Sequence, residues 1–207
     1  MAATPSRMAI EQVTLEAAAL VGAAYATEAV LTDSPISFAA MLAAGFNAQR
    51  DAHMLNEKIR GLGGDQYQGV STAACAVTVA KETNQVADTI VYDNVLKMRA
   101  RCWGYGQAVW MANHDCLPTL AKMSLPVGTG GAPVFIPGAF GQNPDTILGR
   151  PILFTEYCAT VGDLADIMLV NWSQYLEGIY QPMRSDESIH VRFLNLERTF
   201  RFYERNC

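Results

Sequence analysis

The stretch of chain that most restricts the fold is residues 147–175, where two short apolar runs lie close together in the sequence. The first run covers residues 152–157 and the second covers 167–170. Runs of this length, bounded by turn-forming residues, are typical of strands buried on both faces. Gly149 and Pro151 keep a helix out of the first run, because proline lacks the amide donor and restricts the residue before it. Residues 147–175 contain no nucleophile–base pair and no set of metal ligands. We therefore expect this stretch to form part of the hydrophobic core and to have no catalytic role.

A long amphipathic pattern predicts one extended helix. Asp33-Ser34-Pro35 is a helix-start signal, with a capping side chain followed by a proline whose missing amide is not needed in the first turn. Residues 61–64 contain three glycines, which tolerate the left-handed conformation that ends helices. We expect a helix over residues 36–60, with about six turns between Phe38 and Ile59. Its apolar stripe consists of Phe38, Met41, Leu42, Phe46, Ala52, Leu55 and Ile59.

The remaining pattern predicts shorter elements. Helices are expected over residues 90–101 and, capped by Asn113, over about 115–123. The glycine- and proline-rich residues 125–143 are expected to form a surface loop, and residues 185–187 a polar linker. Strands are expected over residues 8–15, 21–27, 74–80, 108–111, 189–193 and 200–203.

Two changes in composition, near residues 69 and 180, suggest a discontinuous domain organisation. Residues 70–180 would form one α/β domain. Residues 1–69, with the long helix, and the strands of 181–207 would pair into a second, elongated domain. The fold class is therefore α+β.

Composition excludes several classes of function. Half of the 207 residues are hydrophobic and 17% are charged, as expected for a globular protein with a core. The net charge of −5, without a run of Lys or Arg, argues against tight DNA binding. Five cysteines without a Cys-x-x-Cys pair indicate reduced thiols in a cytosolic setting. No apolar run is long enough for a membrane span, and residues 17–31 are a poor match to a signal peptide.

Candidate chemistry is weak at every position. Residues 128–131 (Gly-Thr-Gly-Gly) lack the Lys-Ser/Thr ending of a phosphate-binding loop. A nucleophilic Cys102 or Cys116 with His114 would require spatial contact and an orienting group. The acids Glu156, Asp163 and Asp166 fall at strand ends and in a turn, where solvated carboxylates are normal. His53 and His190 are scattered, so no metal site is expected. We expect no cofactor and no enzymatic activity.

A basic and acidic cluster near the C-terminus has two interpretations. Arginine forms planar, paired contacts with carboxylates and is enriched at protein interfaces. The cluster could therefore form contacts between subunits, or it could be a solvated strand face. Its candidate residues are Arg198, Arg201, Arg205, Glu197 and Glu204, with Arg192 on the same predicted strands.

Several segments, in order, resemble the major capsid proteins of tailed phages. Leu148-Gly149-Arg150-Pro151 before an apolar strand is the most specific, because the family has a Leu-Gly-Arg-Pro-Val-type strand there. Residues 27–42 are similar to the segment leading into the family's long spine helix. Residues 63–70 resemble the turn after that helix, and residues 109–113 the strand and Asn cap before the family's variable loop.

The resemblance implies a Hong Kong 97-type fold with an axial domain at 70–180 and a peripheral domain from the flanks. It implies a structural subunit of a phage or prophage icosahedral capsid, self-assembling into hexamers and pentamers that enclose the DNA genome. Expected partners are copies of itself, loosely held packaged DNA, and scaffold, portal or decoration proteins. The protein would reside in the virion capsid after assembly in the host cytoplasm.

Two departures from the family are also expected. The N-terminal arm and extended hairpin that precede the position of Met8 in the family have no counterpart in this sequence, and the sequence stops at Cys207, where family members usually add another strand. No subunit crosslink is carried over. The alternatives are an encapsulin-like compartment shell subunit and a small cytosolic Cys/His hydrolase.

Overall fold

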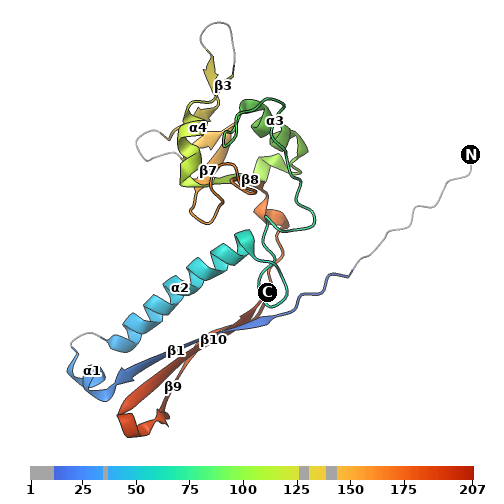
Figure 1. Cartoon of the computed structure of the whole chain (residues 1–207). Coiled ribbons are helices and arrows are strands. Elements are labelled where there is room, and N and C mark those ends of the chain that lie inside the picture. Colours follow the sequence, from blue (N-terminus) through green and yellow to red (C-terminus); the bar gives the residue numbers. More distant parts are fainter. Residues whose placement is uncertain (1–11, 35–36, 126–130, 139–143) are drawn as a thin grey trace, which may run out of the picture. The chain divides into compact units, whose positions relative to one another are not determined.

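The computed structural model describes residues 12–34, 37–125, 131–138 and 144–207, and it divides the chain into two compact units (Figure 1). Unit 1 comprises residues 1–46 and 177–207, and unit 2 comprises residues 47–176. The long helix α2 (Phe38–Arg60) begins in unit 1 and ends in unit 2, which confirms the predicted spine helix over the residues described. No helix in those ranges is long and apolar enough to cross a membrane.

Unit 1 is built on a three-stranded antiparallel sheet of order β1-β10-β9. The central strand β10 (Glu197–Asn206) pairs with β1 (Ala18–Thr27) over ten consecutive residue pairs without a bulge. On its other side β10 pairs with β9 (Ile179–Arg192) in a register that shifts three times. The short helix α1 (Glu28–Asp33) follows β1, and the Thr27 hydroxyl accepts a hydrogen bond from the Val30 amide at its start.

The core of unit 1 lies between this sheet and the first turns of α2. Phe200 and Phe202 are buried, and the Phe46 ring stacks on Phe202 with a centroid distance of 4.6 Å. Gly22 permits this contact, since a Cβ atom there would lie 2.1 Å from the Phe46 ring. Apolar stripe residues from the helix therefore cover one face of the sheet.

Unit 2 contains a five-stranded mixed sheet of order β5-β6-β7-β2-β8. Strand β2 (Val109–Ala112) lies between two of the others and is parallel to β7 (Arg150–Phe154) and antiparallel to β8 (Ile167–Val170). The two apolar runs predicted as strands thus lie on either side of a third. On the other side of β7 the sheet continues with β6 (Thr146–Ile147) and ends with β5 (Phe135–Ile136).

Core residues pack on both faces of this sheet. On one face, Trp110 and Ile152 pack with Val95 of α3 (Tyr92–Arg101) and Leu120 of α4 (Leu117–Ala121). On the other face, Met111 and Met168 pack with Ile59 and Cys158. The Trp110 indole N–H donates a hydrogen bond to the Ile147 carbonyl at 3.1 Å, so its buried polar group is satisfied.

The Leu-Gly-Arg-Pro motif forms the turn between β6 and β7. Leu148 and Gly149 both have positive φ, of 49° and 79°, as a two-residue hairpin turn requires. Leucine is disfavoured in this conformation, but the Tyr105 hydroxyl donates to the Leu148 carbonyl at 2.9 Å and fixes the turn. The Arg150 guanidinium donates to the Ala108 carbonyl at 2.7 Å, which ties the start of β7 to β2.

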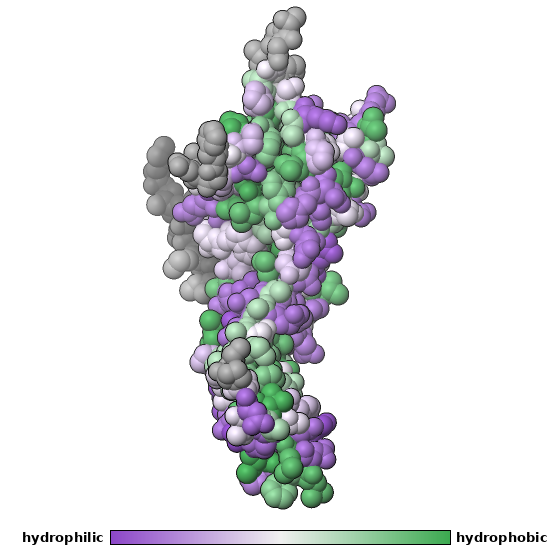
Figure 2. Space-filling model, turned by 90° about the vertical axis from the view of Figure 1, so that its left-hand side faces the viewer, coloured by the Kyte–Doolittle hydropathy of each residue, from purple (hydrophilic) through white to green (hydrophobic). Residues whose placement is uncertain are grey.

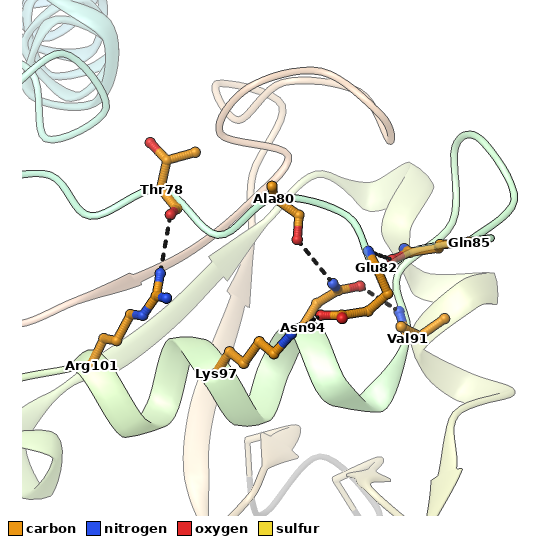
Figure 3. Close-up of polar contacts among 8 residues, drawn as sticks. All are labelled: Thr78, Ala80, Glu82, Gln85, Val91, Asn94, Lys97 and Arg101. Carbon is orange, nitrogen blue, oxygen red and sulfur yellow. Dashed lines mark hydrogen bonds and ion pairs between the residues drawn. The ribbon is translucent and has the colours of Figure 1, made fainter.

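Residues 71–91 form a long irregular segment that side chains hold against α3 (Figure 3). The Asn94 side chain accepts from the Val91 amide at 3.1 Å and donates to the Ala80 carbonyl at 3.5 Å. Lys97 forms an ion pair with Glu82, and Arg101 donates to the Thr78 carbonyl. The remaining short elements are η1 (Tyr105–Gln107), η2 (His114–Cys116), β3 (Ser124–Leu125), β4 (Ala132–Pro133), η4 (Trp172–Gln174) and η5 (Phe193–Asn195).

Several predicted elements are confirmed, with small changes at their ends. The helix predicted over 90–101 is α3, and the strand over 21–27 is part of β1. Asn113 caps the next helical segment, which begins as the 3-10 turn η2 and continues as α4. The segments 189–193 and 200–203 lie largely in β9 and β10.

Other predictions were wrong for identifiable reasons. Residues 74–80 form no strand, because their backbone has no ladder partner and is held by side chains of α3. Residues 185–187 are not a linker but the middle of β9, where an edge strand accommodates exposed polar side chains. The first apolar run is not buried on both faces, since Leu153 is 52% exposed.

Near the N-terminus and in the predicted surface loop the outcome is mixed. Residues 12–15 form no strand, and residues 8–11 lie outside the described ranges. Asp33 ends α1 instead of starting the long helix, and Pro35 is not described. Within 125–143, the described residues include β4 and β5, with Val134 and Phe135 buried in the unit 2 core.

Candidate functional site

The arginines singled out in the sequence lie on the unit 1 sheet and pair within the chain. The Arg201 guanidinium donates to the Asp186 carboxylate on β9 at 2.6 Å, and this bond lowers the pKa of that carboxyl. Arg198 contacts Glu28 at 3.2 Å and Glu187 at 3.5 Å, linking α1, β10 and β9. The hydrogen bond that Arg198 donates to the Glu28 carboxylate is the main reason why the pKa of Arg198 is raised.

The other candidates occupy different environments. Arg192 pairs with Glu197 at 2.9 Å, next to the turn that joins β9 to β10. Arg205 donates to the Ala17 carbonyl at 3.2 Å. Glu204 is 5% exposed and accepts a hydrogen bond from the Asn206 side chain, so it is part of the interior of unit 1. Contacts of these residues between subunits remain a prediction.

Three arginine–tyrosine stacks reinforce unit 1. Arg192 lies 4.0 Å from the Tyr25 ring centroid, Arg205 lies 4.7 Å from that of Tyr180, and Arg184 lies 5.5 Å from that of Tyr203. The tyrosines could not be identified from the sequence, because the stacks depend on the strand register, which no local sequence pattern encodes. Such planar, amphipathic groups are typical of protein interfaces.

The tip of the β9–β10 hairpin exposes apolar side chains. Leu194 is 94% exposed, Leu196 71% and Phe193 65%. This tip lies at the lower end of the view in Figure 2, where apolar surface is gathered. The turn is fixed, because the Leu196 carbonyl accepts a hydrogen bond from the Glu28 amide at 2.9 Å and Leu196 adopts a φ of 53°. A fixed apolar tip is the kind of surface that another protein covers.

Among the described residues of unit 2, one large aromatic side chain is strongly exposed, that of Trp103 at 74%. It follows α3 and precedes Gly104, whose φ of 68° sharply turns the chain. The Asn171 side chain donates to the Trp103 carbonyl at 3.4 Å, so the backbone that presents the indole is held in place. Exposed, well-positioned tryptophans are enriched among the residues that dominate binding energy at interfaces.

The candidate Cys/His pair does not form a nucleophilic site. Cys116 is fully buried and its thiol faces the Asp166 carbonyl oxygen at 3.5 Å. Burial raises the pKa of Cys116 to about 11, with a further contribution from the Asp166 carboxylate. The His114 ring stacks on Phe154 instead, with centroids 6.1 Å apart. Burial also raises the pKa of the Cys102 thiol. A thiolate nucleophile requires the opposite environment.

The remaining candidates have structural roles where they are described. The Asp166 carboxylate accepts from the Gly162 and Ile167 amides at 3.0 and 2.7 Å, and Asp163 accepts from the Thr160 hydroxyl. His53 pairs with Glu57 on α2. Of the glycine-rich residues 128–131, only Gly131 lies in a described range. Within those ranges, no three His, Cys, Asp or Glu side chains are grouped to hold a metal ion.

Apolar side chains that are exposed and held in place, such as Leu194 and Trp103, are typical of proteins that contact other proteins. The model of the phage capsid family matches residues 1–206, so this chain belongs to that family. No curated protein sequence matches the chain.

Solved structures of low sequence identity share the fold. The capsid of an empty GTA particle is 15% identical, with a TM-score of 0.73 over 98% of this chain and 76% of that one. A structure from Mycobacterium phage Cain is 15% identical, with a TM-score of 0.58 over 92% of this chain and 64% of that one. The SrpI encapsulin of Synechococcus elongatus PCC 7942 is 13% identical, with a TM-score of 0.66 over 92% and 68%. These likenesses confirm the predicted Hong Kong 97-type fold.

Proposed function

We propose that this chain is the structural subunit of a phage or prophage icosahedral capsid, forming hexamers and pentamers that enclose a DNA genome. The observation that carries the proposal is the phage capsid family match over residues 1–206. The family and the capsid structures also support self-association and a location in the virion capsid. Assembly in the host cytoplasm is part of the proposal.

The two predicted domains take different roles in this proposal. Residues 70–180 would form the axial domain, which gathers around the symmetry axes of hexamers and pentamers and contains Trp103. The flanks 1–69 and 181–207 would form the peripheral domain, with the arginine-bearing sheet. The fixed hairpin tip supports a contact role for the peripheral domain, because a leucine that is 94% exposed has an apolar surface to bury.

Partners beyond the chain itself also belong to the proposal. Scaffold, portal or decoration proteins would bind the assembled subunits, and packaged DNA would touch them loosely. A net charge of −5 supports loose contact, since phosphate binding depends on clustered Lys and Arg. We propose no enzymatic role and no cofactor. The raised pKa of Cys116, to about 11, argues against a thiol hydrolase.

An encapsulin-like shell is the second candidate, because SrpI encapsulin shares the fold with a TM-score of 0.66. The two candidates differ in what the shell encloses. Particles produced in a bacterial host and treated with nuclease would distinguish them. A capsid in a phage-producing strain retains nuclease-resistant DNA, whereas an encapsulin-like shell retains a co-purifying protein and no protected DNA. Negative-stain images without rings or shells would contradict both.

A further inference from the structure

The outer edge of β1 is an open strand edge. In the antiparallel ladder with β10, the Glu28 amide donates to the Leu196 carbonyl, and Thr27 is paired with Glu197. Hydrogen-bonded pairs alternate along such a ladder. The even-numbered residues of β1 therefore bond to β10, and the odd-numbered residues direct their N–H and C=O groups to the open edge. In the described part of the chain, β1 has no second strand partner.

The two edges of the unit 1 sheet differ in their protection. Unpaired strand edges invite pairing with another chain, and proteins block them with charges, proline and bulges. β9 has all three: Pro182, a register that shifts, and four charged side chains at Arg184, Asp186, Glu187 and Arg192. The ten residues of β1 contain no charge and no proline, and their register is unbroken. The β1 edge is thus left open for a strand.

The side chains along this edge suit an uncharged partner strand. Ala19, Val21, Ala23 and Tyr25 point away from the α2-covered face, and Val21 and Tyr25 are 57% and 47% exposed. An added strand would place its own side chains beside these small and apolar groups. A second β1 meets this requirement, because pairing β1 with itself brings no like charges together.

We propose that the open edge of β1 pairs antiparallel with β1 of a second copy of this chain, forming one continuous sheet across a twofold axis. Self-association of the chain is the premise that this inference takes from the proposed function. Of the edge strands that the structure describes, β5 has two residues and β8 has four, and β9 is protected. β1 alone among them offers ten uncharged residues, and a self-complementary edge gives the isologous contact of a closed dimer.

The test compares Val21→Pro with Val21→Ala. The Val21 amide points to the open edge, so proline removes a donor from the proposed contact and no bond to β10. Alanine removes the same side chain and keeps the donor. Dimer dissociation constants are measured by light scattering after gel filtration, with thermal unfolding of each monomer as the folding control. We expect Val21→Pro to weaken dimerisation about tenfold or more, and Val21→Ala to weaken it less.

The outcomes separate this contact from the proposed function. Shells or rings that form equally well from Val21→Pro, from Val21→Ala and from the wild type would overturn the β1 contact and leave the capsid proposal intact. A wild-type dimer that Val21→Pro abolishes, without larger assemblies, would support the contact and contradict the capsid proposal. Equal weakening by both variants would assign the effect to the side chain and overturn strand pairing.

Hydrogen exchange supplies a second readout. The amides of Ala19, Val21 and Ala23 exchange rapidly in the dilute monomer and slowly in the dimer if a second copy covers the edge. Slow exchange in the monomer would show that a segment of the same chain occupies the edge, and would overturn the proposal.

Discussion

At the scale of single residues, two tryptophans of unit 2 occupy opposite environments. Trp110 is fully buried and its indole donates to the Ile147 carbonyl, whereas Trp103 is 74% exposed. Trp110→Phe removes this hydrogen bond and creates a cavity, so we expect a loss of about 2 kcal/mol in the free energy of unfolding. Trp103→Phe should change it by less than about 0.5 kcal/mol. Urea unfolding curves measure both, and equal losses would contradict this account.

Cys116 gives a prediction about pH. Its pKa is raised from 9.0 to about 11, so the folded state holds the thiol proton more tightly than the unfolded chain. This stabilisation is complete below pH 9 and is lost as the pH rises toward 11. Between these values the free energy of unfolding should fall less steeply in Cys116→Ala than in the wild type. Parallel slopes in urea titrations at pH 8, 9 and 10 would refute the assignment to Cys116.

At the scale of elements, local signals identified some segments and failed for others. The long helix and the Leu148–Gly149 turn were predictable, because amphipathic spacing and turn chemistry are encoded in neighbouring residues. The extent of β9 was missed, since Ser185, Asp186 and Glu187 form a strand only through pairing with β10. The arginine–tyrosine stacks depend on the same register. The arginines of the candidate site were therefore identified from the sequence, whereas the tyrosines that stack on them were not.

The segment 71–91 shows how side chains can order a stretch that lacks a ladder. Asn94 binds it at the Val91 amide and the Ala80 carbonyl, and the nearby Lys97 binds it through an exposed ion pair with Glu82. Asn94→Ala should destabilise unit 2 by about 1–2 kcal/mol and speed amide exchange over residues 80–91. Lys97→Ala is the matched control and should cost less than about 0.5 kcal/mol. Unchanged exchange in Asn94→Ala would show that other contacts hold the segment.

At the scale of the whole molecule, the chain combines two well-packed cores with exposed apolar side chains and an unpaired strand edge. Unit 1 presents Leu194 at its hairpin tip and the open β1 edge, and unit 2 presents Trp103. Each surface is held by hydrogen bonds or ion pairs within its own unit, so little ordering entropy is lost when a partner binds. This combination is what repeated copies of a shell subunit require.

Native mass is the measurement that tests self-assembly most directly. Light scattering coupled to gel filtration gives this mass for the wild-type chain over a range of concentrations. We expect assemblies of five or six copies of the 22.5 kDa chain, or closed shells of many copies. A mass of 22.5 kDa at every concentration would contradict the central claim.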